Sequence, residues 1–167
     1  MQEIINKLNN DLDLPEYDVL LIGDGSGTVS TKCSAWGCFR FLLETEKLDY
    51  YFGGSNLGTN NFAELIPYLN VLWLDHYEGH DIPRRVQIIS DSELTVKCAT
   101  GEYARNYNLP IWNIVDYFKK LGYDIKWKHI ARNSNQLHAL CDKYAGQLRK
   151  EMERFQLTGA KECVMIE

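Results

Sequence analysis

Hydrophobic residues recur along the chain at two spacings, one typical of strands and one typical of helices. Short apolar, β-branched runs bounded by polar residues predict strands at about 17–24, 31–43, 48–52, 86–91 and 123–130. Apolar residues at every third or fourth position predict helices within 1–16 and at about 61–77, 92–99, 109–121 and 135–155. The short connections after the first two strands are typical of hairpins, so the first three strands should form an antiparallel meander.

This order of elements, βββαβα(α)βα, predicts a single α/β domain. We expect a mixed five-stranded sheet, three antiparallel strands followed by two parallel ones, flanked by helices. A length of 167 residues fits one domain, and the chain has no internal repeat or low-complexity linker. The expected divisions are an N-terminal extension over 1–16, the domain over 17–155 and a C-terminal tail over 156–167.

Composition narrows the class of protein. No apolar run reaches the roughly 18 residues of a membrane span, and residues 1–7 do not resemble a signal peptide. The five cysteines are odd in number and form no C-x-x-C pair, which is typical of reduced thiols in the cytosol rather than of disulfides or a zinc site. A net charge of −5 argues against a strongly basic nucleic-acid coat, but it does not exclude a local nucleic-acid site.

Four acids carry the candidate chemistry. Asp24 and Asp91 each end a predicted strand, while Glu64 and Asp142 lie on predicted helices. Acids at the carboxyl ends of neighbouring strands meet at one edge of a sheet, where α/β proteins bind ligands. Clustered carboxylates repel one another, and hard cations such as Mg²⁺ or Mn²⁺ remove that cost. Two such ions can activate water in phosphodiester hydrolysis.

Each acid, taken alone, also has a structural interpretation. Asp24-Gly25 is a common turn dipeptide. Glu64 follows Asn61 at the spacing of a helix capping box. Asp91-Ser92 can cap the next helix, and Asp142 can face His138 one turn earlier on the helix surface.

The four acids occur within motifs that resemble the type I ribonuclease H family over about residues 17–150. The motifs are, in order, Asp24-Gly25-Ser26 at the end of the first strand, Thr59-Asn60-Asn61-Phe62-Ala63-Glu64 as T-N-N-x-x-E, Asp91-Ser92 as the strand-ending D-S, and Trp127 followed by Cys141-Asp142-Lys143-Tyr144-Ala145 as C-D-x-x-A.

This resemblance implies a ribonuclease H-like fold and an endonuclease that cuts the RNA strand of RNA–DNA hybrids, leaving 5′-phosphate and 3′-hydroxyl ends. It also implies that two Mg²⁺ ions, or Mn²⁺ as a substitute, bind to Asp24, Glu64, Asp91 and Asp142. Asn60, Asn61 and the backbone around Gly25 and Ser26 would contact the RNA strand, whose 2′-hydroxyls distinguish it from DNA. The expected partner is the hybrid, and a monomer is favoured.

The chain departs from the family at three places. The Gly-His pair that often precedes the last helix is absent; Arg132 lies near that place, as a substitute cation or as a plain surface arginine. His138 stands where the family often has Asn, as an accessory to the site or as a helix-face histidine. The nearly neutral loop Gly101–Asn108 lacks a basic handle, which implies weaker substrate binding or a partner protein.

Other functions compete with this interpretation. A proofreading exonuclease would carry two acids one residue apart in the first strand, whereas Gly25 and Ser26 follow Asp24. A junction resolvase or an integrase fits a carboxylate cluster, but the T-N-N-x-x-E start disfavours both. A non-catalytic nucleic-acid-binding or interaction domain on the same scaffold is the alternative of another class. A cysteine enzyme is disfavoured, because no Cys-His arrangement is recognisable.

Overall fold

The strands form one mixed sheet with the order β3-β2-β1-β4-β5 in the computed structural model, which describes residues 2–56, 58–78 and 84–158. They are β1 (Val19–Gly27), β2 (Ser34–Leu42), β3 (Lys47–Ser55), β4 (Arg85–Ser90) and β5 (Asp124–His129). The first three are antiparallel neighbours, and β4 and β5 continue the sheet from β1 in parallel. The predicted fold class is therefore confirmed.

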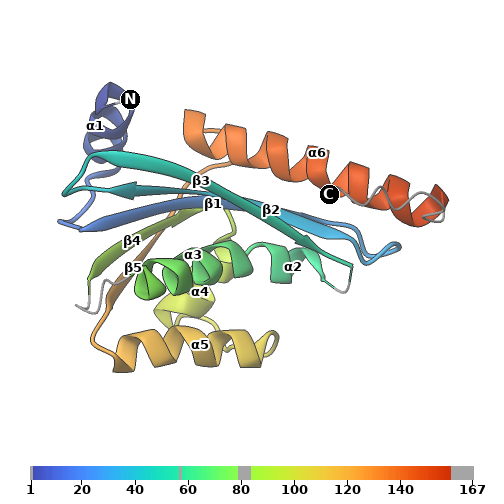
Figure 1. Cartoon of the computed structure of the whole chain (residues 1–167). Coiled ribbons are helices and arrows are strands. Elements are labelled where there is room, and N and C mark those ends of the chain that lie inside the picture. Colours follow the sequence, from blue (N-terminus) through green and yellow to red (C-terminus); the bar gives the residue numbers. More distant parts are fainter. Residues whose placement is uncertain (1, 57, 79–83, 159–167) are drawn as a thin grey trace.

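Helices cover both faces of the sheet (Figure 1). One face carries α1 (Gln2–Leu12) and α6 (Gln136–Thr158), and the other carries α2 (Asn60–Ala63), α3 (Ile66–Tyr77), α4 (Glu93–Thr100) and α5 (Leu109–Lys120). Among the described helices, none combines the length and hydrophobicity needed to cross a membrane.

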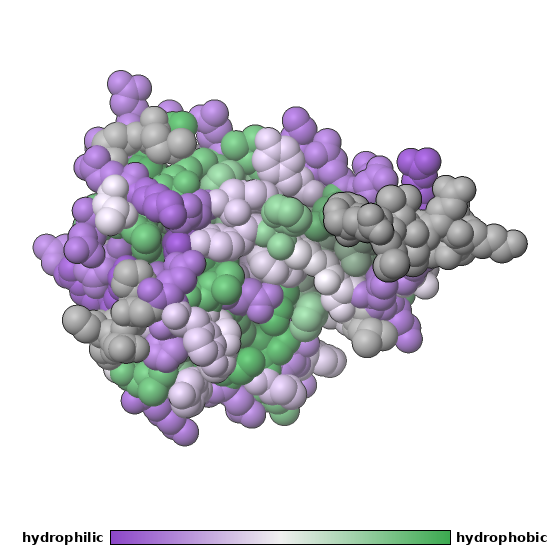
Figure 2. All heavy atoms as spheres, in the orientation of Figure 1, coloured by the Kyte–Doolittle hydropathy of each residue, from purple (hydrophilic) through white to green (hydrophobic). Residues whose placement is uncertain are grey.

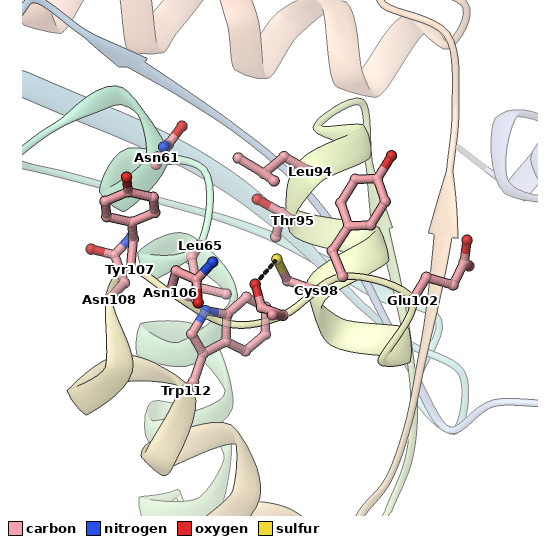
Figure 3. A pocket seen from close by; sticks show the side chains of 12 residues that line it. Asn61, Leu65, Leu94, Thr95, Cys98, Glu102, Asn106, Tyr107, Asn108 and Trp112 are labelled. Atoms are coloured by element: carbon pink, nitrogen blue, oxygen red, sulfur yellow. Dashed lines mark hydrogen bonds between the residues drawn. The ribbon is translucent and has the colours of Figure 1, made fainter.

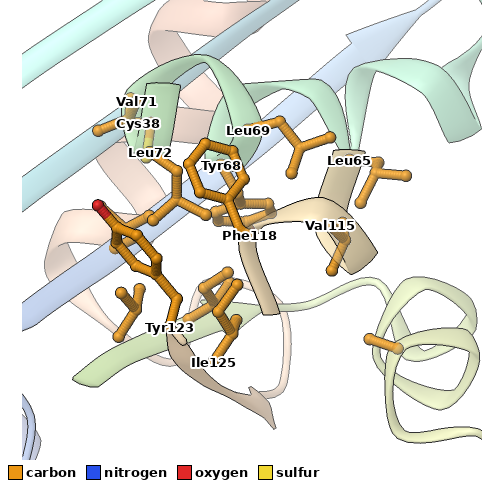
Figure 4. Close-up of a cluster of buried hydrophobic side chains, with 14 of the residues drawn as sticks. Cys38, Leu65, Tyr68, Leu69, Val71, Leu72, Val115, Phe118, Tyr123 and Ile125 are labelled. Carbon is orange, nitrogen blue, oxygen red and sulfur yellow. The ribbon is translucent and has the colours of Figure 1, made fainter. Parts of the chain in front are cut away.

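Two apolar clusters hold the layers together. Alternate residues of a strand point to opposite faces, so Val19 and Leu21 of β1 enter one cluster while Leu20 and Ile22 enter the other. Figure 4 shows the cluster under α3 and α5, where Tyr68, Leu72 and Phe118 are among the buried side chains. The central strand of the sheet, β1, is buried on both faces, which explains the unbroken apolar run at its start.

The predicted helix over 61–77 is wrong in one respect, because it is divided into α2 and α3. Pro67 has no N–H to donate to the carbonyl of Ala63, as a continuous helix would require. In such a helix its ring would also clash with that carbonyl. The chain therefore turns at Glu64 and Leu65 and begins a second helix with Pro67 in its first turn. This break puts Glu64 at the end of a helix rather than within one.

The first and last helices both differ from a simple division of the chain into extension, domain and tail. Ile5 and Leu8 of α1 are buried in the cluster that contains Leu20, so the helix within 1–16 packs on the sheet. Helix α6 continues past the predicted end at 155 to Thr158. The rest of the predicted tail, 159–167, lies outside the described residues, and the division of the chain at 16 and 155 stays a prediction.

Candidate active site

The carboxyl ends of the two central parallel strands position two of the four acids. Pairing of β1 with β4 ends at Ile22 and Ile89, two residues before Asp24 and Asp91. Between these ends lies the phenol of Tyr68 from α3, which is fully buried. Its Oη lies within hydrogen-bond distance of the carbonyl oxygens of Gly23 (2.8 Å) and Ile89 (3.0 Å). One hydroxyl thus holds both acid-bearing strand ends in place.

Asp24, Asp91 and His138 form a group of potential metal ligands at this edge. One potential ligand atom from each lies within 4.8 Å of the other two. His138 comes from α6 and is fully buried, and its Nε2 lies 3.3 Å from Oδ1 of Asp91. The interpretation of His138 as a helix-face histidine is therefore wrong.

Asp24 and Glu64 are buried, and their burial disfavours the ionised form of each carboxyl group. Oδ1 of Asp24 accepts the backbone N–H of Gly25 at 2.8 Å, but its Oδ2 and the Oε2 of Glu64 have no hydrogen-bond partner among the described residues. Burial raises the pKa of Asp24 to about 7. The charge of His138 opposes this rise, and the charge of Asp91 adds to it. Burial, followed by the charges of Asp24 and Asp91, raises the pKa of Glu64 to about 9. Both oxygens are available to a cation.

His138 offsets part of this repulsion. Burial alone would raise the pKa of Asp91, but the contact with His138 and the charges of His138 and Arg132 together lower it. Burial alone would lower the pKa of His138, but the carboxylates of Asp91 and Asp24 together raise it. The imidazole and the carboxylates therefore favour opposite charges on one another.

Asp142 lies beside the group and pairs with the loop arginine. Nη2 of Arg132 donates to Oδ1 of Asp142 at 2.6 Å, and the arginine side chain is 68% exposed. The charge of Asp142 also contributes to raising the pKa of His138, so the interpretation of Asp142 as a helix acid facing His138 stays open. Arg132 places a cation at the edge of the site, near where the resemblance expects a histidine.

Helix α2 brings Glu64 and the two asparagines against β1. Its cap is Thr59, whose Oγ1 accepts the N–H of Phe62 at 3.2 Å, so the capping box of Asn61 and Glu64 is wrong. Oδ1 of Asn60 accepts the N–H of Gly27 at 3.1 Å, and Asn61 is exposed. The Asp24-Gly25 turn is also wrong, because β1 continues to Gly27. The helix cap expected at Asp91-Ser92 is confirmed, with Ser92 as the capping residue of α4.

Arg149 of α6 fixes the same end of β1 from the other face of the sheet. It donates from Nε to Oγ of Ser26 at 2.8 Å and from Nη1 to Oγ1 of Thr28 at 2.7 Å. Sequence reasoning missed both Tyr68 and Arg149. Their contacts join residues far apart in the chain, and no local pattern marks them.

A groove of about 390 Å³ opens beside Asn61, between α2, α4 and the loop before α5 (Figure 3). Aromatic rings and amides line much of it, including those of Tyr103, Tyr107, Trp112, Asn106 and Asn108. Figure 2 shows hydrophobic residues in the lower middle of the same view as Figure 1, over the helices α2 to α5. The groove offers stacking and hydrogen-bonding groups.

The loop that borders this groove carries one basic residue, and its charge is engaged within the protein. Nη1 of Arg105 donates to both oxygens of Asp116 at 2.9 Å, and the guanidinium stacks 4.5 Å from the ring centre of Trp112. The single cation of the loop Gly101–Asn108 is therefore paired within the protein.

We expect Tyr68→Phe to lower the free energy of unfolding by about 1–3 kcal/mol, because the one O–H donor that two buried carbonyls share is lost. Tyr17→Phe is the matched control: its hydroxyl donates to Oδ1 of Asn9 at 2.8 Å, away from the acids. Urea unfolding measures both losses, and isothermal titration with Mn²⁺ should show weaker binding for Tyr68→Phe alone. Equal Mn²⁺ affinity in the two variants would contradict the positioning role.

Several solved structures with the same fold are described as ribonuclease H proteins or domains. The N-terminal RNase H domain of rv2228c from Mycobacterium tuberculosis aligns at a TM-score of 0.68 with 15% identity, covering 83% of this chain and 98% of that one. LC11-RNase H1, isolated from compost and solved with an RNA/DNA hybrid, aligns at 0.67 with 17% identity, covering 80% and 98%. RNase H1 from Halobacterium salinarum aligns at 0.58 with 22% identity, covering 80% and 98%.

At these low identities the structural alignments show the fold alone, and the fold is that of ribonuclease H. No protein-family model matches the sequence, and a search of curated proteins gave no match.

Proposed function

We propose, from the ribonuclease H fold of the chain, that the protein is a metal-dependent endonuclease that hydrolyses the RNA strand of RNA–DNA hybrids. The observation that carries this proposal is the buried pair of carboxylate oxygens, on Asp24 and Glu64, that no described residue satisfies. Buried polar atoms without partners are rare in folded proteins unless a ligand or an ion completes them.

The donors present fit divalent cations. Carboxylate oxygens are the ligands that Mg²⁺ and Mn²⁺ take in proteins, and an ion would remove the repulsion that raises the pKa values of Asp24 and Glu64. Asp24 and Asp91 would hold the ions centrally, with Glu64 and Asp142 completing the pair of sites. When bound, two such ions supply activation of a water molecule and stabilisation of the leaving oxygen.

The chain's own residues would bind and orient the substrate. The backbone at Gly25 and Ser26, held by Arg149, lies next to Asn60 and the exposed Asn61, so donors and acceptors line one edge of the site. Such groups suit the 2′-hydroxyls and base edges of an RNA strand. Arg132 would place a positive charge beside the phosphate, in the role of the missing loop histidine.

The groove beside Asn61, which aromatic rings line, would receive the DNA strand of the hybrid. Stacking on aromatic side chains tolerates any base sequence, which suits an enzyme without sequence preference. The charge of the groove does not favour phosphates, since Glu102 lines the groove and Arg105 is paired with Asp116. Binding should therefore depend only weakly on salt.

One comparison of substrates tests the proposal. A single labelled sequence is supplied as RNA–DNA hybrid, RNA duplex, DNA duplex and single-stranded RNA, each with Mg²⁺ or Mn²⁺. We expect cleavage of the hybrid's RNA strand alone. Cleavage of another substrate would contradict the hybrid assignment, and no cleavage with binding retained would favour a non-catalytic domain.

A further inference from the structure

His138 lies in the interior with neither ring nitrogen satisfied. Its exposed fraction is 0%, and among the described residues neither Nδ1 nor Nε2 has a partner in hydrogen-bond geometry. Nε2 is close to Asp91, at 3.3 Å from Oδ1, but without the alignment of a hydrogen bond. An imidazole that merely fills a core normally donates from one nitrogen to a well-placed acceptor.

The spacing of the donors suits a single ion. Adjacent ligands of an octahedral ion with bonds of about 2.1 Å are about 3 Å apart. The 3.3 Å between Nε2 of His138 and Oδ1 of Asp91 is near this value. One potential ligand atom from each of Asp24, Asp91 and His138 lies within 4.8 Å of the other two. The group thus offers one nitrogen and two oxygens close enough together to share one ion.

A nitrogen donor changes which ions the site favours. Imidazole binds first-row transition ions well, whereas Mg²⁺ takes oxygen ligands almost exclusively and retains its waters. A site built from carboxylates alone would accept Mg²⁺ readily. The same carboxylates with a buried imidazole should rank a transition ion above it.

We propose that His138 is a direct ligand of the ion held by Asp24 and Asp91, and that this site selects a first-row divalent transition ion over Mg²⁺. The inference rests on the proposed function only in assuming that the carboxylates bind an ion.

Mn²⁺ is the probe, because its unpaired electrons report a coordinated imidazole nitrogen directly. Pulsed electron paramagnetic resonance of the full chain with Mn²⁺ should show nitrogen hyperfine coupling from a bound histidine. This measurement on the unmodified protein needs no variant to fold. Bound Mn²⁺ without nitrogen coupling, or no bound Mn²⁺ at all, would overturn the inference.

His138→Asn tests the selectivity, and His129→Asn is the matched control. His129 is exposed, and its Nε2 lies 3.1 Å from the backbone oxygen of Asp91, so it is near the site but outside the group of three. We expect His138→Asn to lose the nitrogen coupling and to weaken Mn²⁺ binding at least about tenfold, with a smaller change for Mg²⁺. His129→Asn should keep both. Unchanged Mn²⁺-to-Mg²⁺ selectivity in His138→Asn would overturn the proposal.

The two proposals fail in different ways. A protein that shows nitrogen coupling and cleaves no nucleic acid would support this site while the proposed function fails. A protein that cleaves hybrids with Mg²⁺ or Mn²⁺ and shows no nitrogen coupling would overturn the histidine ligand alone.

Discussion

Replacing Asp91 by asparagine is expected to abolish hydrolysis of the hybrid while the protein stays folded. Asp91 lies at the centre of the group, its side chain is 11% exposed, and the contact with His138 favours its ionised form. The amide keeps the shape but removes the negative charge that a divalent ion requires. The loss should be about a thousandfold or more, comparable to removing a principal electrostatic group from an enzyme.

Single-turnover cleavage of a hybrid measures this loss, and circular dichroism verifies the fold. Asp124→Asn is the matched control, because Asp124 is an exposed acid at the amino end of β5, opposite the end that faces the site. Rates near that of the unmodified protein for Asp91→Asn would remove Asp91 from the catalytic group. A slow Asp124→Asn would mean that any lost acid lowers the rate.

Gly25→Ala is expected to damage both stability and activity, because α2 lies directly against β1. A β-carbon at Gly25 would be 2.3 Å from the backbone carbon and oxygen of Ala63. Backbone atoms cannot swing aside as a flexible side chain does, so α2 must move away from the strand. Glu64 follows Ala63 directly and would move away from Asp24 with it.

We expect Gly25→Ala to lower the free energy of unfolding by about 3 kcal/mol, the upper part of the usual range for overpacking. A displacement of about 1 Å at Glu64 should slow cleavage about a hundredfold. Gly146→Ala is the control: a β-carbon there meets nothing within 4 Å, and alanine favours the helix by up to about 1 kcal/mol. Urea unfolding and hybrid cleavage measure both variants. A Gly25→Ala protein that matches the unmodified one would show that α2 has room to adjust.

The parts of the fold that follow local patterns could be predicted from the sequence. Apolar runs marked the strands, and the ends of β1 and β4 placed Asp24 and Asp91 at one edge, where the structure has them. The break between α2 and α3 was harder to predict, because the apolar periodicity continues through 61–77 and Pro67 does not show where a helix stops.

Contacts between distant segments were beyond sequence reasoning. The burial of His138 depends on how α6 packs over β1 and β2, which helical periodicity alone does not show. The contacts of Tyr68 with β1 and β4, and of Arg149 with Ser26, join residues separated by 21 to 123 positions. The groove beside Asn61 exists only once α2, α4 and the loop before α5 are assembled.

One measurement tests most directly whether the carboxylate group makes this protein a nuclease. A hybrid labelled on both strands is incubated with the unmodified protein and Mn²⁺ or Mg²⁺, then with excess EDTA, then with the ion restored. We predict that the RNA strand alone is cut, leaving 5′-phosphate ends, and that cutting stops in EDTA and resumes afterwards. Cleavage that persists in EDTA, or a folded protein that leaves both strands intact with either ion, would contradict the assignment.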